Sequence, residues 1–178
     1  MPRSILLIGG ARSGKSRTGQ SVAESSGEPV TIVVTAEPFD DEMTDRIGRH
    51  RADRPATWTT IEAPLDLADG VAAVPDGDTL LLDCLTLWIS NRMLNDTPTE
   101  DIEAEAERVS ALLAARSGRS IVISNEVGLG IVPGDPVSRA FRDVHGRVNQ
   151  IIADCVEATY LVVAGRLLPT LDPLQVLS

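Results

Sequence analysis

The chain has 178 residues, of which 43% are hydrophobic, and it carries a formal net charge of −10. This length and apolar content fit one globular domain with a full core, so we expect residues 1–178 to form a single domain. No apolar run approaches the roughly 18 residues of a membrane span, and the acidic balance argues against nucleic acid or an anionic membrane as a partner. The two cysteines, Cys84 and Cys155, lie in apolar stretches, which favours a cytoplasmic protein over a disulfide framework.

Short apolar segments recur along the chain, with helical patterns between them. Continuous runs of branched residues are typical of strands that are covered on both faces, and such runs occupy residues 4–8, 30–35, 79–84, 120–125 and 159–164. A further, more exposed strand is predicted at residues 57–63. Strands that alternate with helices predict an α/β fold, a single domain with a mostly parallel central sheet flanked by helices. Ligands of such sheets bind at the carboxyl ends of the strands.

Two later segments have strong helical patterns. One covers residues 99–116, and the other runs from about Asp135 to Glu157. In the second segment the apolar residues recur at spacings of four and three, which predicts one buried stripe along a helix. The members of that stripe are Val137, Phe141, Val144, Val148, Ile151 and Cys155.

A glycine-rich turn, "GGARSGKS", follows the first predicted strand and precedes a helical segment. It fits the phosphate-binding pattern G-x-x-x-x-G-K-[ST], in which backbone N–H groups and a helix N-terminus surround a phosphate. Lys15 is the only lysine beside fifteen arginines, which suggests a site that requires a compact ammonium group. The sequence therefore predicts a nucleotide site made by Gly9, Gly10, Ala11, Arg12, Ser13, Gly14, Lys15 and Ser16.

The roles within this loop follow from phosphoryl-transfer chemistry. Lys15 is expected to reach the β- and γ-phosphates, and the Ser16 hydroxyl is expected to bind Mg²⁺. Asp83, which closes the predicted strand "TLLLD", is the natural second metal ligand, directly or through water. A cap on the following helix is the alternative role for Asp83, and both roles can hold together.

A basic segment, "RIGRHRADRP" at residues 46–55, reverses the sign of the chain's charge around His50. With Asp40 as N-cap, a helix over residues 41–51 would place His50 on the same face as Met43 and Ile47. Two interpretations stay open on the residues alone. His50 is either a satisfied core histidine or an imidazole nucleophile that attacks phosphorus while neighbouring guanidinium groups take up the charge.

The sequence resembles the bifunctional adenosylcobinamide kinase/adenosylcobinamide-phosphate guanylyltransferase family of cobalamin assembly. The matching stretches are "GGARSGKS", "DDEMTDRIGRHRADRPATWTTIE", "LLLDCLT" and "SNEVGLGIVP…FRDVHGRVNQ", spread in order over residues 5–164. The resemblance implies a P-loop homotrimer that phosphorylates adenosylcobinamide with ATP or GTP. It then implies transfer of GMP from GTP through a guanylyl-histidine, giving adenosylcobinamide-GDP. Some members have two adjacent histidines at this point, where this chain has Arg49 and His50. Since His50 is the histidine that this chain has there, we place the acceptor role on His50.

Further positions take on roles from the same resemblance. Glu126 would be a base for the corrinoid hydroxyl or a metal or water contact, and residues 127–135 would form a substrate loop. Glu62 would read guanine, because a carboxylate accepts from both N1–H and the exocyclic amine, although a surface glutamate is the alternative. His145 is expected to be structural or at the surface, whereas Arg139, Arg142 and Asn149 are expected to form a polar stripe. Besides Glu62 and Asp83, the residues expected to line the nucleotide are Val34, Thr35, Ala36, Arg51, Ala52, Asp53 and Arg54.

Two rival functions remain. The first is a monofunctional P-loop kinase of a small molecule, in which His50 is structural, and covalent guanylylation would separate it from the bifunctional enzyme. The second is a nucleotide-controlled interaction protein, which predicts slow hydrolysis, no acceptor turnover and partner binding that depends on nucleotide.

Overall fold

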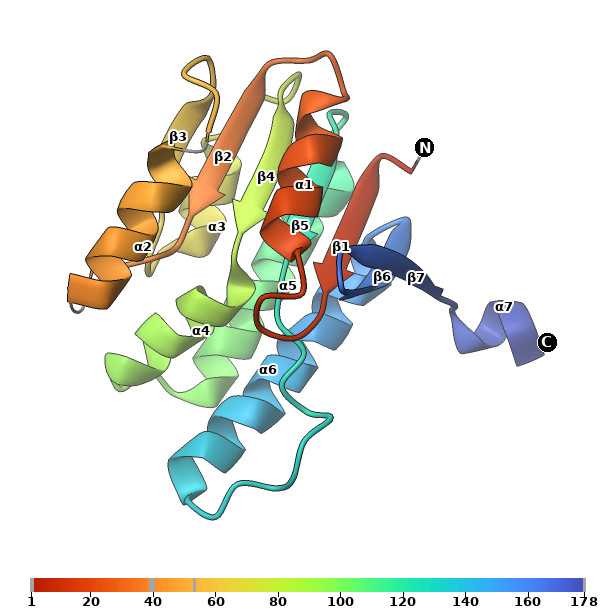
Figure 1. Cartoon of the computed structure of the whole chain (residues 1–178). Helices are drawn as coiled ribbons and strands as arrows, with labels where there is room; N and C mark the ends of the chain where they lie inside the picture. The colour runs from red at the N-terminus through yellow and green to blue at the C-terminus, as the bar shows by residue number, and fades with distance from the viewer. Residues whose placement is uncertain (1, 39–40, 53, 178) are drawn as a thin grey trace.

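A computed structural model describes residues 2–38, 41–52 and 54–177; of the residues in its helices, the side chains at positions 42, 43, 46, 47, 49, 50, 175 and 177 lie outside the description. The described strands form one sheet in the order β3-β2-β4-β5-β1-β6-β7 (Figure 1). All neighbours run parallel except β6 and β7. The strands are β1 (Ser4–Ile8), β2 (Val30–Val34), β3 (Thr59–Glu62), β4 (Thr79–Asp83), β5 (Ser120–Ile123), β6 (Ala158–Val163) and β7 (Arg166–Thr170).

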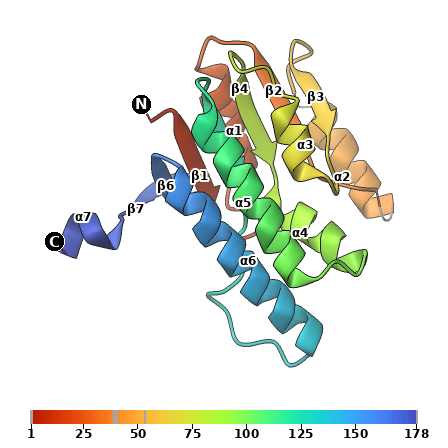
Figure 2. The ribbon, with the colours of Figure 1, turned by 180° about the vertical axis from the view of Figure 1, so that it is seen from behind.

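Helices cover both faces of the sheet. α1 lies on one face, and α3, α5 and α6 lie on the other (Figures 1 and 2). The helices are α1 (Lys15–Glu24), α2 (Asp41–Ala52), α3 (Leu67–Ala72), α4 (Leu85–Leu94), α5 (Thr99–Ala115), α6 (Pro136–Cys155) and α7 (Pro173–Leu177). None of the helices in the described part of the chain is both long and apolar enough to cross a membrane.

The hydrophobic core has two halves, one on each face of the sheet. Alternate residues of a strand point to opposite faces, so Leu6 packs with α3, α5 and α6 while Leu7 packs on the side of α1. Because both faces are covered, the central strands are apolar at nearly every position, as the sequence predicted. This burial fixes the carboxyl ends of β1, β4 and β5 at one edge of the sheet.

Most predicted elements are confirmed within one or two residues. The strand predicted at residues 57–63 exists as β3 and is more exposed than the other predicted strands. One position in the predicted stripe of α6 is wrong: Val137 is 71% exposed, whereas Val144, Val148 and Ile151 are buried. The first turn of α6 extends beyond the edge of the sheet, so no described helix covers it (Figure 1). α3, β7 and α7 were not predicted from the sequence, and α4 was expected only as a helix after Asp83, without bounds.

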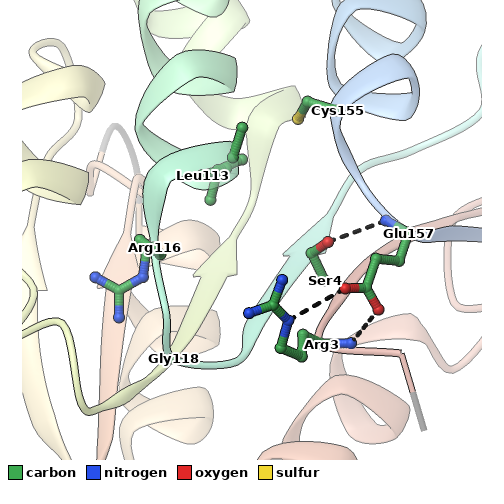
Figure 3. A pocket seen from close by; sticks show the side chains of 8 residues that line it. Arg3, Ser4, Leu113, Arg116, Gly118, Cys155 and Glu157 are labelled. Atoms are coloured by element: carbon green, nitrogen blue, oxygen red, sulfur yellow. Dashed lines mark hydrogen bonds and ion pairs between the residues drawn. The ribbon is translucent and has the colours of Figure 1, made fainter.

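The amino end of β1 is fastened to the start of β6. The Arg3 backbone N–H donates to Glu157 Oε2 at 2.7 Å, and its Nε donates to Oε1 at 3.2 Å. The Glu157 N–H donates in turn to Ser4 Oγ at 3.0 Å. A pocket that also includes Leu113 and Cys155 lies beside this pair (Figure 3). It is at the amino end of the strands, opposite the glycine-rich turn, so it is not the candidate nucleotide site.

Candidate nucleotide-binding site

The glycine-rich turn connects β1 to α1, as the sequence predicted. A Cβ atom at Gly9 would collide with the carbonyl oxygen of Val162 in β6. Gly14, the N-cap of α1, has a φ of 101°, in the left-handed region that favours glycine. The Gly165 N–H, from the turn between β6 and β7, donates to Ser13 O at 2.8 Å. The end of β6 and the turn that follows it therefore hold the loop in shape, a support that no local sequence signal had indicated.

Lys15 is almost fully buried, and its ammonium group lies within the loop. Nζ donates to Gly9 O and to Gly10 O, each at 2.8 Å, and to Ser13 Oγ at 3.4 Å. The loop carbonyls therefore hold the charge of Lys15 at the start of α1, where backbone N–H groups also point. Ser16 is half-buried in the first turn of the same helix. This arrangement suits the phosphates of a nucleotide.

Asp83 lies on the same edge of the sheet as the glycine-rich turn, with one strand between them. β5 pairs with β4 on one side and with β1 on the other, and Asp83 lies opposite Ile123. On its other side Asp83 lies opposite Val34, which in turn lies opposite Glu62. The strand ends therefore present Glu62, Val34 and Asp83 in one row. This brings together three of the residues predicted to line the nucleotide.

Thr35, just after β2, is bonded entirely within the protein. Its N–H donates to Asp83 O at 3.3 Å, and its hydroxyl donates to Cys84 O at 2.7 Å and accepts from Cys84 N at 3.0 Å. The Asn91 side chain donates to Thr35 O at 2.7 Å. Thr35 thus fixes the chain just after Asp83, while the neighbouring Ala36 is half-buried.

Burial raises the pKa of the Cys84 thiol to about 11, so this thiol stays protonated at neutral pH.

Glu126 lies beside the glycine-rich turn. Its backbone N–H donates to Gly9 O at 2.9 Å, the same carbonyl that accepts from Lys15. Its carboxylate is half-buried and accepts from the Gly128 N–H at 2.5 Å. The residue before it, Asn125, is held by Thr86 and Asn149. These two supports were not predicted, although both lie in the quoted motifs.

The helix predicted around the basic segment exists as α2, but the side chain of His50 lies outside the described residues, as does all of Asp53. The predicted inward direction of the His50 side chain, on one face with Met43 and Ile47, therefore stays a prediction. The predicted N-cap of α2, Asp40, also lies outside the described residues. Arg51 and Ala52 are exposed.

Arg54, which follows α2, is half-buried, and burial lowers the pKa of its guanidinium group. The negative charge of Asp83 acts in the opposite direction. The end of the basic segment therefore reaches the row of strand ends.

The segment of residues 127–135 leads from Glu126 to α6 and is exposed apart from its half-buried Val127 and Pro133. Arg139 donates to Pro133 O at 3.0 Å and to Gly134 O at 2.8 Å. Asp135 caps α6 by accepting from Ser138 N at 2.8 Å. Apolar side chains point outward between these anchors, and Ile131 is 97% exposed. Arg139 is thus used to brace the loop, and Asn149, predicted in the same polar stripe, is buried instead.

The oxygen ligands that the site offers fit a metal ion that binds together with a nucleotide. No cluster of three or more His, Cys, Asp or Glu side chains able to hold a metal occurs among the described residues. Mg²⁺ in nucleotide enzymes is typically bound through one or two protein oxygens, phosphate oxygens and water. One hydroxyl, on Ser16, and one carboxylate, on Asp83, are consistent with that pattern.

Two solved structures of ATPases share the fold of this chain. An ATPase from the type III secretion system of pathogenic bacteria is similar with a TM-score of 0.52 and 11% identity, over 89% of this chain and 50% of that one. The ATPase EscN of enteropathogenic E. coli gives a TM-score of 0.54 at 10% identity, over 92% of this chain and 43% of that one. At this identity the likeness concerns the fold alone.

Comparisons of sequence reach further. The bifunctional adenosylcobalamin biosynthesis protein CobP of Pseudomonas aeruginosa is 44% identical over 92% of this chain and 95% of its own length. The corresponding CobU protein of Salmonella typhimurium is 37% identical over 90% of this chain and 96% of its own. The profile of the CobU family, described as cobinamide kinase / cobinamide phosphate guanyltransferase, matches residues 5–170. The chain therefore belongs to the cobinamide kinase / cobinamide phosphate guanyltransferase family.

Proposed function

We propose that this chain phosphorylates adenosylcobinamide and then transfers GMP from GTP to the phosphorylated product, giving adenosylcobinamide-GDP. The observation that carries the proposal is the single edge of the sheet at which the glycine-rich turn, Glu126, Asp83 and Glu62 all lie. Membership of the family supports both reactions. We place the enzyme in the cytoplasm, with no nucleic acid among its partners.

In the first reaction the γ-phosphate of ATP or GTP passes to the hydroxyl of the aminopropanol arm. The O–H proton moves to the Glu126 carboxylate as the new O–P bond forms, and the bond between the β,γ-bridging oxygen and the γ-phosphorus breaks. Lys15, held in the loop at the start of α1, would pair with the charge on the β- and γ-phosphates. Ser16 and Asp83 would hold Mg²⁺, which supplies further neutralisation of the phosphate oxygens when bound.

In the second reaction an imidazole nitrogen of His50 attacks the α-phosphorus of GTP. A nitrogen–phosphorus bond forms, the bond to pyrophosphate breaks, and the leaving pyrophosphate carries the negative charge. A phosphate oxygen of the corrinoid then displaces the imidazole, so GMP leaves His50 for the product. Glu62 accepts from two donors on guanine, a pattern that adenine does not offer. The proposed nucleotide site is completed by Val34, Thr35, Ala36, Arg51, Ala52, Asp53 and Arg54.

The corrinoid acceptor is proposed to lie on the loop of residues 127–135. This loop starts one residue after Glu126 and presents Leu129, Ile131 and Val132 to solvent, which suits the apolar rim of a macrocycle. A homotrimer is proposed from the family resemblance. Exposed apolar residues in β7 and α7, such as Leu168 and Leu174, support an assembly of several copies.

The test is a product assay. The chain is incubated with adenosylcobinamide, GTP and Mg²⁺, and the corrinoids are separated and weighed by mass spectrometry. We expect adenosylcobinamide phosphate first and adenosylcobinamide-GDP later. Accumulation of the phosphate alone would make the chain a monofunctional kinase. Slow GTP hydrolysis with an unchanged corrinoid would contradict both reactions and favour a nucleotide-controlled interaction protein.

A further inference from the structure

A connected set of hydrogen bonds surrounds His145, which is fully buried in α6. Its Nε2 lies 3.0 Å from Thr86 Oγ1, and its Nδ1 lies 3.3 Å from Asn149 Nδ2. Thr86 lies in the first turn of α4, just after β4, and Asn149 is one turn further along α6. Both partners also bond the backbone of Asn125, after β5. The imidazole therefore joins the two side chains that hold Asn125.

The directions of these bonds define one tautomer. The amide group of Asn149 donates to Asn125 O at 3.0 Å, so the same nitrogen offers its second hydrogen to His145. Nδ1 is then the acceptor, and Nε2–H donates to Thr86. Burial, with a smaller effect of the positive charge on Lys15, lowers the pKa of His145 to about 4. A neutral imidazole with a fixed donor and a fixed acceptor agrees with this environment.

The bonds pass from Asn125 to the nucleotide site through a single peptide unit. The carbonyl of that unit, Asn125 O, accepts from Asn149, and its N–H, on Glu126, donates to Gly9 O at 2.9 Å. The preceding N–H, on Asn125, donates to Thr86 Oγ1 at 2.9 Å. The orientation of Glu126 against the glycine-rich turn thus depends on Thr86 and Asn149, the two side chains that contact His145.

We propose that His145 is a positioning residue that holds Glu126 against Gly9 by orienting Thr86 and Asn149. The part of this proposal that concerns turnover rests on the proposed function, because it requires Glu126 to face the acceptor hydroxyl. The part that concerns geometry stands without it. His145 itself touches neither nucleotide nor acceptor.

The geometric part is tested by amide hydrogen exchange in the whole chain. His145→Leu replaces the imidazole with an apolar side chain of similar length that has no hydrogen-bonding group. Val148→Ala, a buried position on the same helix, is the matched control, because it removes core contacts and leaves the hydrogen bonds intact. We expect the amides of Asn125 and Glu126 to exchange at least tenfold faster in His145→Leu than in Val148→Ala. Equal exchange in the two variants would overturn the proposal.

The turnover part is tested by the phosphorylation of adenosylcobinamide. We expect His145→Leu to lower kcat at least tenfold with KM for the nucleotide changed less than twofold, whereas Val148→Ala keeps kcat. His145→Gln, whose amide N–H can replace the donor to Thr86, should recover part of the loss. A kcat that falls equally in His145→Leu and Val148→Ala would contradict the positioning role. A wild-type chain without turnover would remove the proposed function, while the exchange result would still decide the geometric part.

Discussion

The carboxyl edge of the sheet has two unlike sides. On the side of β1, β5 and α6, the polar groups of Lys15, Glu126 and His145 are bonded inside the protein. On the side of β2, β3 and α2, Glu62 and Arg51 are exposed. A site whose groups are already fixed suits the charge development of phosphoryl transfer, which gains from preorganised partners. An open basic surface suits a step that must admit first GTP and then a bulky corrinoid phosphate.

Both reactions need the triphosphate, so damage to the fixed side should be the most severe. Lys15→Ala removes the only ammonium group that a lysine can supply to the β- and γ-phosphates. We expect kcat/KM for phosphorylation of adenosylcobinamide to fall about a thousandfold, or about 4 kcal/mol. Steady-state assays with ATP and with GTP measure it. A loss of less than about tenfold with either nucleotide would show that the glycine-rich turn is not the phosphate site.

The buried histidine makes the fixed side sensitive to acid. The folded pKa of His145 is about 4 and its ordinary value is 6.5, so between these values the unfolded chain binds a proton that the folded chain does not. The folded protein therefore keeps its full stability with respect to His145 above pH 6.5. As the pH falls toward 4, the free energy of unfolding decreases by about 3 kcal/mol because of this one group. The pKa values of Asp76 and Asp135 are also lowered, and their contributions to stability are lost only as the pH falls below the ordinary value of 3.8.

Urea denaturation at pH 7, 6, 5 and 4 measures this effect. His145→Leu should be less stable than the wild type at pH 7 but should lose less stability as the pH falls. Parallel curves for the two proteins would mean that His145 is not held neutral.

Damage to the open side should be selective. Glu62→Gln removes one of the two carboxylate oxygens that would accept from guanine, and it removes nothing that adenine needs. We expect kcat/KM for guanylyl transfer from GTP to fall about tenfold, or about 1.4 kcal/mol, with phosphorylation by ATP nearly unchanged. Parallel assays of the two reactions decide this, and equal losses would mean that Glu62 does not read the base.

The same contrast explains how much could be predicted from the sequence. The glycine-rich turn was predictable because eight consecutive residues carry the pattern between a strand and a helix. The central strands were predictable because both of their faces are covered by helices. The bonds of His145 to Thr86 were not, since these residues are 59 positions apart and no local pattern relates them. The bonds of Thr35 to Cys84 and Asn91 were not predictable either, because these partners are about 50 positions away along the chain, while its place beside the nucleotide stays a prediction.

Covalent guanylylation of α2 is the central claim, and one labelling experiment tests it most directly. The chain is incubated with GTP labelled at the α-phosphate and Mg²⁺, denatured, and examined for label. We predict one guanylyl group per chain, stable to base and lost in mild acid, as a phosphorus–nitrogen bond should be. His50→Ala should carry no label yet still phosphorylate adenosylcobinamide, whereas His145→Leu should remain labelled. A wild-type chain that never labels, or a His50→Ala chain that still does, would contradict the account.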